Sequence, residues 1–208
     1  MAASYTLYGN FISGPSYKVG LMLSLCGIDF AFRHVDLAKG QHKSPDYLAV
    51  NRFGQVPALV HDGKTIVQSD VILLYLAKVT GKFGGASEDE RWQIQEVQHW
   101  EADRLHSSTG RLRFFTRFLK QEPPVMELYK KGTDMALAQL DGLLAGKTWL
   151  VGNGMTVADI SCYVGTQQAK DAGVDLGQWN NVTAWTQRIE ALPGYKPFGE
   201  ALPKADRG

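Results

Sequence analysis

Cysteine, net charge and long apolar runs are all scarce in this chain. Of its 208 residues only two are cysteine, Cys26 and Cys162, and their separation matches neither a C-x-x-C motif nor a zinc-ligand spacing. Both stand beside apolar residues, which predicts reduced thiols packed against helices. We therefore expect no disulfide framework, no metal site and a cytoplasmic protein.

Charge and hydropathy exclude further classes of protein. Lys and Arg number 22 against 21 Asp and Glu, a formal net charge of +1, and the two signs are interspersed. Nucleic-acid-binding domains usually concentrate a basic surplus on one face, so we expect no nucleic-acid partner. The longest apolar stretches fall far short of the ~20 residues that span a bilayer, and the N-terminus lacks the basic start and apolar run of a secretory signal. We expect no membrane partner.

The first forty residues alternate between strand-like and helix-like patterns. Residues 4–8 are β-branched and aromatic and predict a short strand. Residues 17–25 are densely apolar and end at Gly27, as in a helix packed against a sheet. Residues 30–37 predict a second strand. A strand, a helix and a strand in this order form a βαβ unit, which requires a parallel pair with a right-handed crossover.

The following forty residues add a helix, a hairpin and a further helix. Ser44 is expected to cap a short helix that closes at residues 51–54. Strands at 56–60 and 65–67 flank an Asp-Gly turn, a strong signal for an antiparallel hairpin. Ser69 is expected to cap a helix that runs to about residue 79. This order, βαβ, helix, ββα, is the thioredoxin-like arrangement.

After a glycine-rich stretch at residues 81–87 the strand patterns disappear. Helical patterns cover residues 88–119, 123–144 and 182–191, and Thr156 with Asp159 predicts a capping box at the start of another helix. We therefore predict an α/β thioredoxin-like domain (residues 1–80, βαβαββα), a linker (81–87) and an all-α helical domain (88–208).

The dipeptide Val56-Pro57 opens a predicted strand, where proline is a poor choice because it cannot donate to the ladder. Taken locally, a trans proline at a strand start is the simpler interpretation, since only about 5% of X–Pro bonds are cis. The thioredoxin-like order favours a cis bond, which leaves the N–H and C=O of Val56 facing a cleft. An extended peptide can then pair with Val56 as an added strand.

Two predicted helix starts carry candidate binding groups. At Gln68-Ser69, backbone N–H groups and the helix dipole suit a carboxylate, and the Gln68 amide can both donate and accept. Simple capping by Ser69 is the alternative. At the first helix, the Ser13 hydroxyl can donate to a thiolate that the dipole favours. Ser16 and Tyr8 are the competing donors for that thiolate.

With these residues in place, the chain resembles the cytosolic glutathione S-transferase family nearly end to end. The resemblance is carried by HKSPDYL at residues 42–48, NRFGQVPAL at 51–59, Gln68-Ser69, and TVADI at 156–160. It is nearest to the serine-type classes, such as the plant phi class and related bacterial enzymes. Arg52 stands where the family often has proline, and Gln68 where many serine-type members have an acid, so the class stays open.

The resemblance implies a role for each matched position. Ser13 would activate the thiol of glutathione, Val56 would pair with the cysteinyl backbone next to a cis Pro57, and Gln68 and Ser69 would hold the γ-glutamyl group. The glycyl carboxylate would lie near His42, Lys43 and Gln55, and an electrophile pocket would involve Phe11, Ile12, Trp100 and Asp103.

The resemblance also implies a homodimer in which Asp103 approaches the partner's glutathione. Glutathione would be a co-substrate, without a metal, that is transferred to a hydrophobic electrophile. Two alternatives stay open. One is a glutathione-dependent disulfide or peroxide reductase, which needs no cysteine of its own, and the other is a non-catalytic binding module.

Overall fold

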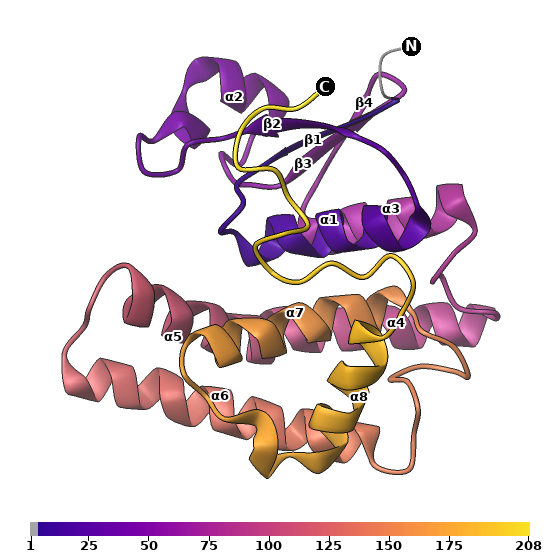
Figure 1. Cartoon of the computed structure of the whole chain (residues 1–208), viewed down its shortest axis with the longest axis vertical. Helices are drawn as coiled ribbons and strands as arrows, with labels where there is room; N and C mark the ends of the chain where they lie inside the picture. Colours follow the sequence, from indigo (N-terminus) through magenta and orange to yellow (C-terminus); the bar gives the residue numbers. More distant parts are fainter. Residues whose placement is uncertain (1–3) are drawn as a thin grey trace. The chain divides into compact units, whose positions relative to one another are not determined.

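The computed structural model describes residues 4–208 (Figure 1). Residues 1–3 lie outside the described residues. They belong to the predicted first domain and to the N-terminus where we expect no secretory signal. The chain divides into two compact units. The first contains the described residues up to Lys82 together with Leu192–Gly208, and the second is Phe83–Ala191.

The first unit contains a four-stranded sheet in the order β2-β1-β3-β4. Its strands are β1 (Tyr5–Gly9), β2 (Ala31–His34), β3 (Ala58–His61) and β4 (Lys64–Val67). β1 and β2 are parallel, whereas β3 is antiparallel to both β1 and β4. The predicted parallel pair and the predicted antiparallel hairpin are both confirmed.

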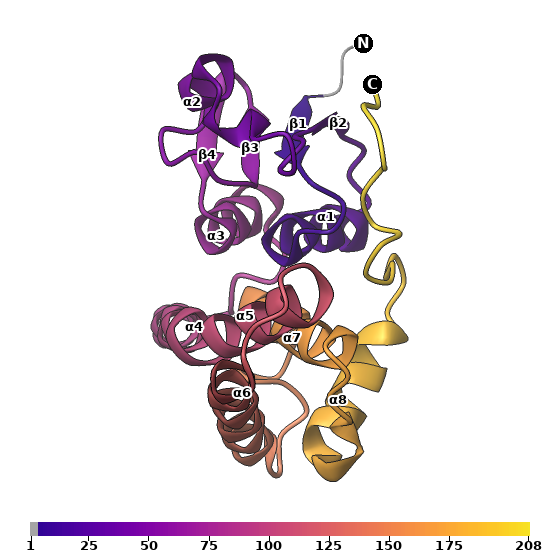
Figure 2. The ribbon, with the colours of Figure 1, turned by 90° about the vertical axis from the view of Figure 1, so that its left-hand side faces the viewer.

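Helices flank this sheet on both sides. α1 (Gly14–Cys26) and α3 (Ser69–Thr80) pack side by side on one face, and α2 (Pro45–Val50) lies on the far side of the strands (Figures 1 and 2). The core of the unit consists of apolar side chains with no solvent exposure, among them Leu7, Leu21, Leu23, Phe32, Leu59, Ile72, Leu73 and Leu76.

Local residue choices explain where these elements begin and end. Gly27 follows α1 in the left-handed conformation (φ 71°), and its N–H bonds the carbonyls of Leu23 and Ser24. Asp62 and Gly63 both have positive φ (48° and 73°), the geometry that a two-residue hairpin turn requires. The sequence predicts the end of α1 and this turn because each depends on only a few neighbouring residues.

The cap of α3 differs from the prediction. Ser69 is the first helical residue, and Gln68 occupies the N-cap position with φ 70° and without a side-chain capping bond. Gln68 adopts the positive φ as the chain leaves β4, which moves the start of the helix one residue earlier than a Ser69 cap would give. The prediction that Ser69 caps α3 is therefore wrong.

The second unit is helical throughout. Its helices are α4 (Glu88–Trp100), α5 (Ser107–Arg117), α6 (Pro123–Leu144), α7 (Val157–Asp171) and α8 (Asn180–Glu190). Together with the sheet-containing first unit, this confirms the predicted fold class of a thioredoxin-like part followed by an all-α part.

The predicted single helix at 88–119 contains an irregularity. A π-helical turn, Glu101–His106, joins α4 to α5, and such a turn holds one residue more than an α-turn. Leu105 in this turn packs so close to Gly165 that a Cβ there would lie 2.7 Å from the leucine side chain. The missing side chain of Gly165 thus makes room for Leu105, a contact that spacing along one helix cannot reveal.

The predicted capping box at the start of α7 is present. The Asp159 carboxylate accepts the backbone N–H of Thr156 at 2.8 Å, and it also accepts the Leu150 N–H at 3.0 Å and the Trp185 indole N–H at 2.9 Å. Burial raises the pKa of Asp159, and these hydrogen bonds act against that rise. The motif predicted locally therefore also ties α7 to α8.

The C-terminal segment corrects the predicted domain boundary. The range 88–208 assigned residues 192–208 to the helical domain, but these residues belong to the first unit. They run along α1 and end beside β2 (Figures 1 and 2). There Phe32 and Arg207 form an antiparallel bridge, with N···O distances of 2.7 and 2.9 Å. The backbone groups at the open edge of β2 thus bind the C-terminal segment to the first unit.

Within residues 4–208, no helix combines the length and the apolar content needed to cross a membrane. Over the same residues, no group of three or more His, Cys, Asp or Glu side chains is arranged to hold a metal ion.

Candidate functional site

Three predicted site segments meet at one end of the sheet in the first unit. Tyr8 in β1 pairs with Ala58 in β3, and Ala58 pairs with Val67 in β4. Because these three residues form one row across the sheet, the loop after β1, the segment before β3 and the residues after β4 all start from the same end. Ser13, Val56-Pro57 and Gln68-Ser69 lie within those segments.

The segment before β3 carries Val56 outside the strand pairing. The ladders of β3 begin at Ala58, so Val56 precedes the paired residues. Val56 is partly exposed, Pro57 is buried, and the bond between them is cis. The predicted cis proline is confirmed.

Two buried side chains, one in α2 and one at its C-terminal end, hold the segment before β3. The Tyr47 hydroxyl and the Asn51 side-chain amide both donate to the Gln55 carbonyl, at 2.8 and 2.6 Å. The Asn51 side chain also accepts from the N–H of Phe53 at 3.0 Å. Burial raises the pKa of Tyr47 from 10.0 to about 12, so its hydroxyl keeps its proton and stays a donor even at a pH where an exposed tyrosine ionises. The backbone ahead of Val56 is thereby fixed from one side.

Lys43, Gln55 and Gln68 are brought together at the same place. The Lys43 ammonium donates to the Gly54 carbonyl at 3.0 Å, and the Gln68 amide donates to Gln55 Oε1 at 3.2 Å. Gly54 has φ 58°, and a Cβ on it would lie 2.9 Å from the His42 carbonyl oxygen. The absence of a side chain at Gly54 therefore lets the 42–43 turn approach the segment that carries Gln55.

The start of α3 is open to solvent on its Gln68 side. Gln68 is exposed and Ser69 is partly exposed. Asp70, the second residue of the helix, pairs with the buried Lys18 of α1 at 3.2 Å, which anchors this end of α3 on α1. First-turn backbone N–H groups and the positive end of the helix dipole make such a start a site for an anion.

Ser13 caps α1, as expected for a residue at its amino end. Its Oγ accepts the N–H of Ser16 at 3.2 Å, and its own N–H bonds the Asn10 carbonyl at 3.0 Å. Because that bond uses a lone pair of Oγ, the hydroxyl hydrogen is left to donate. The bonds among Lys43, Gln55 and Gln68 do not include Ser13, which belongs to the same sheet end through β1.

The competing donors have different surroundings. Ser16 is fully buried, and its Oγ accepts the backbone N–H of Asn10 at 3.3 Å. Tyr8 is partly exposed in β1, and its ring is tilted against that of Tyr47 with centroids 6.2 Å apart. Of the three hydroxyls, the one on Ser13 combines partial exposure with a position at a helix start.

The predicted pocket residues fall into two pairs. In the first unit, Phe11 stacks on His34 with centroids 5.6 Å apart, and Ile12 is exposed. In the second unit, the Trp100 indole donates to Gln139 in α6 at 3.0 Å, and Asp103 forms an exposed ion pair with Arg104 at 2.9 Å. The role of these residues in an electrophile pocket stays a prediction.

Sequence reasoning assigned no role to Tyr47, Asn51 or Asn10. Asn51 is 1% exposed and Asn10 is 5% exposed, and each uses its side-chain amide to hold a loop at the sheet end. The roles of the two asparagines could have been predicted from their positions directly after a strand and a short helix. An asparagine side chain in such a position commonly bonds the backbone two residues on.

Comparison with protein families gives matches over most of the chain. The glutathione S-transferase N-terminal domain matches residues 3–78, and the glutathione S-transferase C-terminal domain matches residues 105–193.

Individual proteins match over nearly their full length. Mouse glutathione S-transferase theta-2 is 32% identical, over 94% of this chain and 84% of the mouse protein. The disulfide-bond oxidoreductase YfcG of Escherichia coli is 30% identical, over 92% of both chains. The crystal structure of a glutathione S-transferase from Pseudomonas fluorescens superposes with a TM-score of 0.88 at 31% identity, covering 94% of this chain and 99% of that one.

Proposed function

This chain belongs to the glutathione S-transferase family, and from that premise we propose that it binds glutathione at the sheet end of its first unit and activates the thiol for attack on an electrophilic small molecule. The observation that carries the proposal is the row Tyr8, Ala58 and Val67. The segments that leave this row carry the Ser13 hydroxyl, the backbone of Val56 and the start of α3. A hydroxyl can bind a thiolate, an unpaired strand end can bind a peptide backbone, and a helix start can bind a carboxylate.

In the proposal, glutathione lies extended beside Val56. Its cysteinyl N–H and C=O pair with the backbone of Val56, because this residue precedes the strand ladders. Its γ-glutamyl carboxylate meets the start of α3 at Ser69 and the Gln68 amide, which Gln55 holds at 3.2 Å. Its glycyl carboxylate lies toward Lys43, whose charge attracts it, with His42 and Gln55 beside it.

Ser13 stabilises the thiolate in this arrangement. A hydroxyl at a helix start donates to the sulfur, the helix dipole favours the negative charge, and the proton is released to water. Each unit by which the thiol pKa falls corresponds to about 1.4 kcal/mol. The thiolate then forms a sulfur–carbon bond with the electrophile, and the leaving group departs with the electron pair of the broken bond. Phe11, Ile12, Trp100 and Asp103 are the proposed surroundings of that electrophile.

A homodimer in the cytoplasm completes the proposal, with family membership as its main support. Large apolar side chains are exposed on two helices of the second unit: Trp92 on α4 is 59% exposed, and Leu128 and Met135 on α6 are 67% and 65% exposed. A second copy of the chain is the proposed cover for these side chains.

A disulfide reductase is the second candidate function, and the relative named as a disulfide-bond oxidoreductase favours it. Neither cysteine stands at the sheet end. Cys26 ends α1, roughly 20 Å along the helix from Ser13, and Cys162 is buried in α7. The sulfur of glutathione would therefore attack the disulfide, forming a mixed disulfide and releasing a thiolate, and a second glutathione would complete the reduction. Turnover of an aryl halide compared with turnover of a mixed disulfide separates the two chemistries.

The proposal is tested with Ser13→Ala, using Tyr8→Phe as the matched control that also removes one hydroxyl. We expect Ser13→Ala to lower turnover at least tenfold, because a bond to the charged sulfur contributes about 1.5–3 kcal/mol, and to change the glutathione Kd less than threefold. Tyr8→Phe should stay within threefold of the unmodified chain in both measurements.

Two results would contradict the proposal. Full turnover in Ser13→Ala would show that another hydroxyl donates to the thiolate. An inactive Tyr8→Phe or Ser16→Ala variant would then identify that donor. Failure of the unmodified chain to bind immobilised glutathione removes the proposed ligand and leaves a non-catalytic module of another specificity.

A further inference from the structure

The loop that presents Ser13 is fixed by the side chain of Asn10. The Asn10 amide nitrogen donates to the Val35 carbonyl at 2.9 Å, and its Oδ1 accepts the N–H of Ile12 at 3.1 Å. Turning the amide over would place oxygen against the Val35 carbonyl and nitrogen against the N–H of Ile12. The two bonds therefore determine which way the amide faces.

This orientation assigns the hydrogen bond between Asn10 and His34. The second hydrogen of the Asn10 amide faces His34 Nε2 at 3.3 Å. Because an amide nitrogen only donates, Nε2 must be the acceptor, and the ring proton lies on Nδ1. The same imidazole ring stacks on Phe11 at a centroid distance of 5.6 Å and an interplanar angle of 28°. His34 thus contacts two consecutive residues of the loop.

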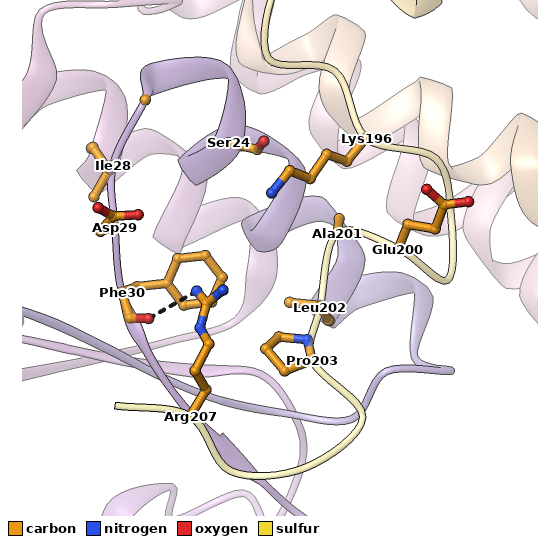
Figure 3. A pocket seen from close by; sticks show the side chains of 11 residues that line it. Ser24, Ile28, Asp29, Phe30, Lys196, Glu200, Ala201, Leu202, Pro203 and Arg207 are labelled. Carbon is orange, nitrogen blue, oxygen red and sulfur yellow. Dashed lines mark hydrogen bonds between the residues drawn. The ribbon is translucent and has the colours of Figure 1, made fainter.

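His34 is in turn held by the C-terminal segment. Its backbone N–H donates to Asp206 Oδ1 at 2.7 Å, two residues along β2 from the bridge between Phe32 and Arg207. The Arg207 guanidinium lies over the Phe30 ring at 5.0 Å and donates to the Phe30 carbonyl at 3.1 Å. Figure 3 shows this contact at the wall of a pocket of about 400 Å³ between the segment and the turn before β2.

We propose that His34 is a positioning residue for the loop 10–13, and that Asp206 and Arg207 act through it. The imidazole connects the edge strand β2 to Asn10 and Phe11, while the C-terminal segment secures that strand from outside. The role in the reaction rests on the proposed function, since it is Ser13 that the loop presents. The consequence is that residues at the far end of the chain set the position of the thiolate-activating hydroxyl.

A pair of variants separates the two contacts of the imidazole. His34→Phe keeps a ring against Phe11 and loses the acceptor for Asn10, whereas His34→Gln keeps an acceptor and loses the ring. In the ligand-free protein we expect the amides of Ile12 and Ser13 to exchange with solvent about fivefold faster in His34→Phe, the effect of one lost hydrogen bond. His34→Gln should stay within twofold. Exchange in His34→Phe equal to that of the unmodified chain would overturn the proposal.

The C-terminal segment has its own matched variants. Asp206→Ala removes the acceptor for the His34 N–H, Asp206→Asn retains one, and Lys204→Ala changes an exposed side chain of the same segment. We expect faster exchange of Ile12 and Ser13 in Asp206→Ala only. Equal exchange in all three variants would show that the segment does not act on the loop.

Turnover tests the role in the reaction. In His34→Phe we expect kcat to fall about fivefold while KM for glutathione stays within twofold, because the proposed contacts of glutathione lie at Val56 and Gln68. Faster exchange without any change in kcat would overturn the reaction role. Failure of the unmodified chain to bind glutathione would overturn the proposed function instead, and the exchange comparison would still decide whether His34 holds the loop.

Discussion

The starts of α7 and α3 are both polar, but the protein closes the first with its own side chains and leaves the second open. At α7 the buried Asp159 carboxylate accepts N–H groups from Thr156, Leu150 and Trp185. At α3 the N-cap residue Gln68 is exposed and makes no side-chain capping bond. Helix starts in one chain can therefore be closed by acceptors from the chain itself or left without a side-chain cap.

The supports of the two starts differ as well. Around α7 the polar groups are buried and bond one another, so a substitution there leaves groups without partners. Around α3 the supporting bonds from Tyr47 and Asn51 lie behind the open edge and fix the Gln55 carbonyl, while Gln68 faces solvent. Substitutions at α7 should therefore act on stability, and those near α3 on ligand binding.

Breaking the closed start should have the largest effect. Asp159→Ala removes the acceptor of four buried donors, namely three N–H groups and the Thr156 hydroxyl, and we expect the free energy of unfolding to fall by about 3–5 kcal/mol. Urea denaturation measures this loss. Glu88→Ala, an exposed first-turn acid of α4, is the matched control and should change stability by less than about 1 kcal/mol. Similar stabilities for the two variants would refute the structural role of Asp159.

Loosening the support of the open start should weaken binding. Asn51→Ala removes one of the two donors to the Gln55 carbonyl and the acceptor for Phe53. We expect the glutathione Kd to rise about tenfold, because the segment before Val56 is then held by the Tyr47 hydroxyl alone. Calorimetry measures the Kd, with Asp46→Ala in the neighbouring α2 as an exposed control. An unchanged Kd in a folded Asn51→Ala protein would mean that Val56 does not take part in binding.

Removing the Tyr47 hydroxyl, which supports the segment near α3, should have a smaller and pH-dependent effect on stability. Burial raises its pKa from 10.0 to about 12, so the stabilisation from its protonated form is complete below pH 10 and is lost as the pH rises toward 12. We expect Tyr47→Phe to cost about 1 kcal/mol between pH 6 and pH 9, and the difference from the unmodified chain to shrink between about pH 10 and pH 12. A difference that stays constant up to pH 12 would contradict the buried donor.

The sequence predicted those features that depend on near neighbours. Gly27, the Asp62-Gly63 turn and the Thr156–Asp159 box each act within a few residues, and the cis Pro57 followed from the thioredoxin-like order of elements.

The features that the sequence did not predict depend on contacts between distant residues. Arg207 pairs with Phe32 across almost the whole chain, and Leu105 fits against Gly165 from another helix. The backbone angle of Gln68 is set as β4 passes into α3, so residue preference alone misplaced the cap on Ser69.

We propose that glutathione binds at the sheet end that carries Ser13, Val56 and Ser69. Titrating reduced glutathione into the isotope-labelled protein and following the backbone amide signals tests this directly. We expect the signals of these three residues to shift together with a single Kd. Signals that do not move, or that move only near Phe30 and Arg207 at the pocket beside the C-terminal segment, would contradict this binding site.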